Sequence, residues 1–411
     1  MKTLTIHNMK SWLAALACLA LASCVNDKES DCTPVTPGES DIWLSVSIHN
    51  LATVSRADVP ADGEQHPDED ALDAENYINT SDVNLLLFDK DKRLIRTFDS
   101  NSYRLTGADG AYTLSVKASS EYFTYAGSAD DARIDCSIMV VANLNGTGQG
   151  DGPFEFNNSE MTFRPLTELS GLYRGFPYTG SVGDGAAWEP AVDSRLIPMS
   201  GITKASFTRA ELNAATTEAT ALKLPAIYIQ RAMAKVRLID AIQDGDYEIT
   251  AVTLTGSNTR GTYLPLLSDG APWAENTAVI EYGTARPEWY DAVTHLPSAR
   301  VRYTDNLNLV GKGAGNQYDA YRVYVPELDR DKIGTAEGPV FNISVRNTKT
   351  GATTAFVYTF LPGAANPSGD FARNHIYQVA VTGVVEDVEV TLQTSYTVCP
   401  WSTRSTDIEF N

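Results

Sequence analysis

The stretch Ile42-Trp43-Leu44-Ser45-Val46-Ser47-Ile48 alternates between apolar and polar residues, as a half-buried β-strand does. Short runs of β-type residues recur along the chain and are separated by turn residues such as Asn347-Thr348-Lys349-Thr350-Gly351. These runs lie at 83–88, 112–116, 134–142, 226–229, 234–239, 247–254, 321–325, 341–345, 355–360, 376–384, 388–392 and 396–398. Because no long helical pattern separates them, we expect an all-β fold of sandwich type rather than a parallel α/β sheet.

The length and composition predict two globular domains. The chain has 411 residues, of which 43% are hydrophobic, which is enough for two separate cores. One short helical pattern, Thr208 to Thr220, precedes a fresh set of strands. We therefore expect one β-sandwich domain over residues 41–205 and a second over residues 222–411.

The first residues have the features of an export signal. Two lysines precede an apolar run from Trp12 to Ala22, which is shorter than the about 20 residues that a membrane-spanning helix needs. The following Leu21-Ala22-Ser23-Cys24 resembles a bacterial lipobox, in which the cysteine is lipidated. This predicts a signal peptide over 1–23, lipidation of Cys24 and a polar tether over 24–40. The alternative is an ordinary signal peptide with an incidental cysteine.

Charge and cysteine content exclude several kinds of partner and site. The formal net charge is −20, and so acidic a surface repels phosphate backbones, so no nucleic-acid binding is expected. The remaining cysteines form no Cys-x-x-Cys pair, which predicts neither a disulfide framework nor a zinc site. Cys136 falls in an apolar strand pattern and is expected in the core. Residues 57–76 hold eight acids and no Lys or Arg, which predicts an exposed loop; the acids lack the spacing of a calcium-binding loop.

No motif for catalysis or cofactor binding is found in the sequence. It has no Gly-x-Ser-x-Gly, no His-Glu-x-x-His and no phosphate-binding loop, since Gly311-Lys312 is followed by Gly313. We therefore expect no enzymatic activity, no cofactor and no metal. A hydrolase with an unmarked pair of carboxylates stays open as a minor alternative, because no local signal identifies such a pair.

Several segments together resemble the fimbrillin family, the pilus subunits and associated lipoproteins of Bacteroidales. The matching segments are Val83-Asn84-Leu85-Leu86-Leu87-Phe88-Asp89, Ile138-Met139-Val140-Val141-Ala142-Asn143, Ile197-Pro198-Met199-Ser200-Gly201, Arg231-Ala232-Met233-Ala234-Lys235-Val236, Tyr324-Val325-Pro326-Glu327, Arg373-Asn374-His375-Ile376-Tyr377 and Pro400-Trp401. They occur in the family's order across residues 42–411. The resemblance implies two consecutive transthyretin-like β-sandwich domains behind a lipoprotein signal peptide. We interpret the motif residues, His375 included, as structural.

The resemblance also implies assembly by donor-strand exchange. In fimbrillins an Arg-directed protease removes the tether and the first strand, and the groove so opened accepts a C-terminal strand of a neighbouring subunit. Arg56 follows the strand-like segment Ile42 to Ile48 and is the predicted cleavage position, although it could equally be an ordinary loop arginine. Segments 388–398 and 408–410 could supply the donor strand. The alternating candidates within the first are Val388, Val390 and Leu392.

These features predict a structural subunit of a surface fimbrium that contributes to adhesion. Its expected partners are other fimbrial subunits and the outer membrane, through lipid on Cys24, and its expected location is the cell surface, within the fimbrium after processing. The alternative is a lipid-retained fimbrial anchor, or a surface lipoprotein that does not polymerise and binds a glycan or a host protein. No further C-terminal, lectin-like domain is apparent, which favours a stalk-type subunit over a tip adhesin.

Overall fold

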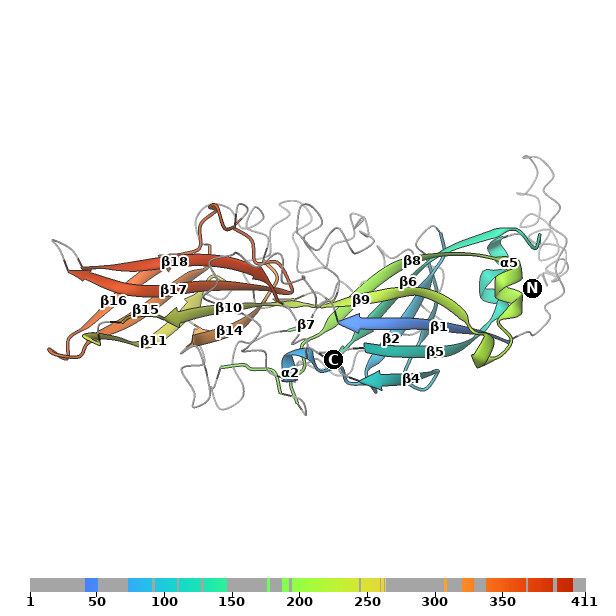
Figure 1. Cartoon of the computed structure of the whole chain (residues 1–411), viewed down its shortest axis with the longest axis horizontal. Coiled ribbons are helices and arrows are strands. Elements are labelled where there is room, and N and C mark those ends of the chain that lie inside the picture. Colours follow the sequence, from blue (N-terminus) through green and yellow to red (C-terminus); the bar gives the residue numbers. More distant parts are fainter. Residues whose placement is uncertain are drawn as a thin grey trace, which may run out of the picture. The chain divides into compact units, whose positions relative to one another are not determined.

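The structure of the chain is a computed structural model (Figure 1). The residues that it describes are 41–50, 73–90, 93–108, 111–126, 129–145, 176–177, 187–191, 194–243, 245–258, 260–261, 263, 307–308, 320–328, 338–366, 369–386 and 390–401. Residues Glu39–Asn411 form one compact unit. Nearly all regular elements are strands, which confirms the all-β prediction.

The first sandwich is an eight-stranded sheet with the order β3-β2-β6-β8-β9-β1-β5-β4. Its strands are β1 (Asp41–Asn50), β2 (Val83–Phe88), β3 (Leu94–Phe98), β4 (Tyr103–Ala108), β5 (Ala111–Ser119), β6 (Arg133–Ala142), β8 (Met199–Thr208) and β9 (Leu222–Arg231). The pairing between β8 and β9 extends over two residue pairs, Met199 with Arg231 and Ser200 with Gln230. Apolar side chains from the strands on both sides of this short pairing share one buried core. The sheet therefore folds over on itself and forms the two layers of a sandwich.

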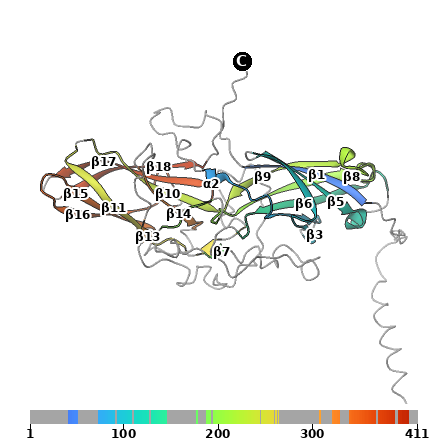
Figure 2. The same cartoon turned by 90° about the horizontal axis from the view of Figure 1, so that it is seen from below.

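The second sandwich consists of two four-stranded sheets (Figures 1 and 2). One has the order β14-β10-β17-β18, from β10 (Met233–Asp240), β14 (Ala320–Pro326), β17 (His375–Glu386) and β18 (Val390–Pro400). The other has the order β13-β11-β15-β16, from β11 (Tyr247–Thr255), β13 (Leu307–Asn308), β15 (Val340–Asn347) and β16 (Thr353–Thr359). Side chains from both sheets, such as Val236, Val379, Ile343 and Phe341, are buried in one core. The short strands β7 (Phe176–Pro177) and β12 (Arg260–Gly261) pair with each other.

The region around the expected domain boundary belongs to the first sandwich. β8 lies before residues 209–221 and β9 after them, and both are strands of the eight-stranded sheet. The change from one sandwich to the next falls at Ala232, between β9 and β10. The segment 222–231 therefore completes the first sheet instead of opening the second sandwich, because it pairs with β1 and β8. The domain limits themselves stay a prediction.

Helices in the described residues are short. They are α2 (Asp73–Asn76), η3 (Ser120–Ala126), α5 (Arg209–Ala214) and η5 (Glu218–Thr220). α5 begins where the helical pattern was predicted, and Thr208 caps it reciprocally with Glu211. Within the described ranges no helix is long and apolar enough to cross a membrane.

Candidate functional site

β1 is an interior strand of the first sandwich. It pairs antiparallel with β5 and parallel with β9, so both of its edges are hydrogen-bonded (Figure 1). Ile42, Leu44, Val46 and Ile48 point into the core and are each at most 2% exposed. The prediction of an alternating strand is confirmed, but Trp43 does not share the buried face. It lies half-buried on the opposite face, because successive side chains of a strand alternate.

β18 is the edge strand of its sheet among the described strands, and it pairs with β17 in a long antiparallel hairpin. Val390 lies opposite Glu386 and is 41% exposed, whereas Leu392 lies opposite Val384 and packs against the core of the second sandwich. Tyr396 and Val398, on the same face as Leu392, also pack against that core. The candidate donor residues therefore form part of a strand that is held by its own subunit.

The other candidate site residues lie outside the described residues. Cys24, Arg56 and Val388 all fall there, as do the tether over 24–40 and the segment 408–410. Lipidation, cleavage and strand donation stay predictions for these positions.

The acidic stretch 57–76 was expected to be an exposed loop, but its last four residues form a helix that contains a buried acid. Residues 73–76 form the short helix α2, and Glu75 is 0% exposed. The charge is tolerated there because the carboxylate is fully supplied with partners, as buried ionised groups require. The apolar neighbours Ala74 and Ile78, which are also buried, mark the end of the exposed acidic pattern.

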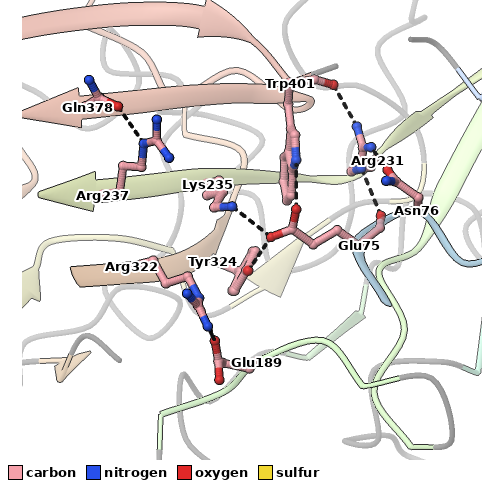
Figure 3. A network of polar contacts seen from close by, with 10 residues as sticks. All are labelled: Glu75, Asn76, Glu189, Arg231, Lys235, Arg237, Arg322, Tyr324, Gln378 and Trp401. Atoms are coloured by element: carbon pink, nitrogen blue, oxygen red, sulfur yellow. Dashed lines mark hydrogen bonds and ion pairs between the residues drawn. The ribbon is translucent and has the colours of Figure 1, made fainter. Parts of the chain in front are cut away.

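Glu75 lies at the centre of a buried polar cluster (Figure 3). Its Oε1 accepts a hydrogen bond from the Tyr324 hydroxyl and lies 2.9 Å from Lys235 Nζ, and its Oε2 accepts from Trp401 Nε1 at 3.2 Å. Arg231 adds a donation from Nε to the Glu75 carbonyl oxygen at 2.9 Å. These five residues, called the Glu75 cluster below, come from α2, β9, β10, β14 and the end of β18.

Arg231 ties the cluster to Trp401, the residue that follows β18. Its Nη1 donates to the Trp401 carbonyl oxygen at 2.8 Å and to Asn374 Oδ1 at 2.7 Å, and its Nη2 donates to Asn76 Oδ1. Its guanidinium also lies 4.6 Å from the centre of the Trp401 ring, a distance at which cation–π attraction is favourable. The Trp401 ring stacks on Tyr324 with centroids 5.8 Å apart.

Burial shifts the acid–base behaviour of the cluster. Desolvation lowers the pKa of Lys235, opposed by the charge of Glu75, and it lowers the pKa of Arg231 to about 10. Desolvation also raises the pKa of the Tyr324 hydroxyl well above its ordinary value, and the charge of Glu75 adds to this. At neutral pH Tyr324 is therefore a hydrogen-bond donor to Glu75 and not a base.

A second buried ion pair lies between Arg373 and Glu327. Arg373 Nη2 is 3.1 Å from Glu327 Oε2, and both side chains are 0% exposed. Arg373 Nη1 also donates to the Tyr263 carbonyl oxygen at 2.8 Å. Removing one partner from a buried pair of this kind is strongly destabilising, because it leaves a charge in an apolar environment.

The motif residues quoted for the resemblance hold backbone segments in place. Asn143 follows β6 and has a φ of 59°, and its amide donates to the carbonyl oxygens of Tyr77 and Ile197. Asn374 has a φ of 57° and accepts from Arg231. A Cβ on Gly201 would lie 2.2 Å from the Tyr228 carbonyl oxygen, so the close approach of β8 and β9 requires glycine there.

Cys136 and His375 are both buried. Cys136 is buried in β6, as predicted, and burial raises the pKa of its thiol to about 12. His375 Nδ1 lies 2.8 Å from the Arg373 carbonyl oxygen, and desolvation lowers the pKa of this histidine. No group of three or more His, Cys, Asp and Glu side chains in the described part of the chain is arranged to hold a metal ion.

Solved structures similar to this chain include fimbrial proteins and putative cell adhesion proteins. The tip fimbrial protein Mfa3 from Porphyromonas gingivalis, with a C-terminal truncation, has 12% sequence identity and a TM-score of 0.46 over 88% of this chain and 100% of that chain. A fimbrial assembly protein from Parabacteroides distasonis has 12% identity and a TM-score of 0.42 over 87% of this chain and 100% of that chain. The fimbrial anchor protein Mfa2 from Porphyromonas gingivalis has 11% identity and a TM-score of 0.35 over 88% and 100%.

These are proteins of the class that the sequence resemblance implies. At such identities and TM-scores the likeness assigns no role to this chain. Neither the scan against protein-family models nor the search of curated proteins gave a match.

Proposed function

We propose that this chain is a structural subunit of a surface fimbrium and assembles by protease-triggered donor-strand exchange. The observation that carries the proposal is the place of β1. It is an interior strand with four buried apolar side chains, and it precedes the predicted cleavage position Arg56 in the sequence.

β1 fits the role of a plug in the precursor. Each fully buried Ile, Leu or Val contributes about 1.5–3 kcal/mol, so the four side chains of β1 contribute about 6–12 kcal/mol before any loss of conformational entropy. Removing β1 would expose the apolar groove and leave the facing edges of β5 and β9 without partners. Such edges bind another strand of matching pattern.

β18 fits the role of the incoming strand. Leu392, Tyr396 and Val398 lie on one face of β18, with the exposed Thr394 between the first two, so this face matches the alternation of Ile42, Leu44, Val46 and Ile48 at three of four positions. β18 is an edge strand among the described strands, so it can leave β17 without separating another described strand pair. A C-terminal strand of one copy could thus take the place of β1 in the next.

The surface location follows from the lipobox-like sequence. We propose that lipid on Cys24 anchors the precursor in the outer membrane and that cleavage at Arg56 releases the trimmed subunit into the fimbrium. The chain then acts through strand pairing with other fimbrial subunits, contributes to adhesion as part of the fibre, and has no catalytic role and no cofactor. Changing Cys24→Ala should abolish membrane fractionation and remove the lipid mass.

Trimming in vitro tests the proposal. The purified precursor is treated with an arginine-specific protease, and mass spectrometry checks that Arg56 is the cleaved bond. The trimmed protein should form ladders that resist mild denaturation, while an Arg56→Ala precursor, treated in the same way, should remain monomeric.

A deletion after residue 386 removes the proposed donor strand β18 and leaves the acceptor groove in place, so it tests the two roles separately. Trimmed protein with this deletion should form no ladders, although its first sandwich stays folded and accepts a strand from intact copies. If trimmed wild-type protein remains monomeric at high concentration, the proposal of a polymerising structural subunit is wrong. The alternative, a lipid-retained anchor or a non-polymerising surface lipoprotein, then replaces it.

A further inference from the structure

The C-terminal end of β18 is held far more firmly than its beginning. Trp401, the residue after β18, is 1% exposed, and its backbone N–H donates to the Asn374 carbonyl oxygen at 2.8 Å. Its carbonyl oxygen accepts from Arg231 and its indole N–H donates to Glu75. Every polar group of Trp401 is therefore engaged inside the fold.

The start of β18 contrasts with this end. The pairing of β17 with β18 shifts register between Val381 and Gly383, and beyond this shift most residues of β18 and the last two of β17 are exposed. Val385 is 37% exposed and Val390 41%. Val384 and Leu392 still pack against the core, but this half of the hairpin is more exposed than the Trp401 end, which therefore contributes most to holding β18 in its sheet.

Glu75 links this end to the segment that follows the predicted cleavage position. α2 lies after Arg56 in the sequence, so Glu75 stays with the subunit when the chain is cut there. The contacts of Glu75 with Lys235, Tyr324 and Trp401 involve no atom of β1. Trimming by itself therefore leaves the Glu75 cluster intact.

We propose that the Glu75 cluster is a lock that keeps β18 in its own subunit after trimming, until the vacated groove of a neighbouring subunit takes the strand. This inference rests on the proposed function. In it, β1 blocks the groove that accepts a strand, and the Glu75 cluster additionally restrains the strand β18 that is donated. Freeing β18 separates the Trp401 indole N–H from Glu75 and the Trp401 carbonyl oxygen from Arg231, which removes two charge-assisted hydrogen bonds from a buried site.

Hydrogen exchange in the untrimmed protein tests the lock without any need for polymerisation. Trp401→Phe keeps an aromatic ring and removes the indole N–H, and Glu75→Gln removes the charge. In Trp401→Phe the amides of β18 should exchange about tenfold faster or more, because a hydrogen bond to a charged group is lost, while the amides of β10 and β14 stay within about twofold. In Glu75→Gln the rise should extend to β10 and β14, because Lys235 and Tyr324 also lose their charged partner. Glu189→Gln is the matched control, because it removes an ion pair with Arg322, a residue of β14.

Ladder formation after trimming gives the second readout. Trp401→Phe and Glu75→Gln should polymerise faster than wild type, whereas Glu189→Gln should match wild type. The lock is refuted if β18 exchange in Trp401→Phe is unchanged, or if it rises together with exchange throughout β10 and β14. If Glu75→Gln fails to fold, Trp401→Phe alone decides the question. Wild-type protein that never polymerises would refute the proposed function, while the exchange data would still decide whether Trp401 holds β18.

Discussion

Lys235→Met should destabilise the folded protein by about 3–5 kcal/mol, the usual result of removing one partner from a buried ion pair. Lys235 is 1% exposed and Glu75 is 0% exposed, and their charged atoms are 2.9 Å apart. Methionine fills a similar volume but cannot donate to the carboxylate. Glu75 would then stay buried with only the neutral donors Tyr324 and Trp401 on its side-chain oxygens. The double variant Glu75→Gln with Lys235→Met removes both charges and should lose less stability than the two single variants together.

Urea unfolding measures the free energies of the wild type, the two single variants and the double variant, which together form a double-mutant cycle. Tryptophan fluorescence reports on the buried Trp401 and Trp188, and far-UV circular dichroism reports on the strands, so coincident transitions are required before free energies are compared. Lys349→Met is the control, because it removes an exposed ion pair with Asp246 and should change stability by less than about 1 kcal/mol. If the two single effects add within about 0.5 kcal/mol, Glu75 and Lys235 are not coupled and the reasoning about the cluster is wrong.

Four further outcomes are expected. Leu44→Ala should lower the free energy of unfolding by about 2–5 kcal/mol in urea titrations, and a loss below about 1 kcal/mol would contradict a tightly packed β1. Gly201→Ala should lower the thermal midpoint, since its Cβ would meet the Tyr228 carbonyl oxygen; an unchanged midpoint would argue against the close approach of β8 and β9. Burial lowers the pKa of His375 below its value in the unfolded chain. As the pH falls below about 6.5, the unfolded chain is therefore protonated at His375 before the folded chain is. The free energy of unfolding then decreases by at most about 1.4 kcal/mol per pH unit for this group. His375→Asn should flatten that part of the curve, and an identical pH profile would contradict the assignment. Cys136 should resist thiol reagents until the protein unfolds, because burial raises the pKa of its thiol to about 12; rapid labelling of the native state would show otherwise.

Sequence patterns predicted most of the strands, but β3, β4 and β8 were not among the predicted runs. Alternation in Ile42 to Ile48 predicts one buried face. The apolar run that contains Cys136 predicts the strand that the structure shows as β6. The helix at Thr208 was found from its local composition, and its reciprocal cap with Glu211 explains why it begins there. These features depend on neighbouring residues, which a single sequence contains.

The Glu75 cluster could not be predicted in the same way. Its members come from five elements spread between residues 75 and 401, and nothing in the sequence pairs Glu75 with Lys235 or Trp401. An acid at the end of an acidic stretch is normally solvated, so local reasoning assigned it to an exposed loop. The place of 222–231 in the first sheet was missed for a similar reason. It pairs with β1, which lies far away in the sequence, and the sequence between the two strands does not indicate that they pair.

A disulfide between β1 and β5 tests the central claim most directly. Ser45 and Ser115 are directly opposite each other in the antiparallel pair, so Ser45→Cys with Ser115→Cys can tie β1 to its sheet. After oxidation and cleavage at Arg56, this variant should stay monomeric, and a reducing agent should restore ladders to the level of trimmed wild type. Ser45→Cys alone should form ladders with or without the reducing agent. Ladders that form equally well while the disulfide is intact would contradict the claim that β1 must leave its groove for subunits to assemble.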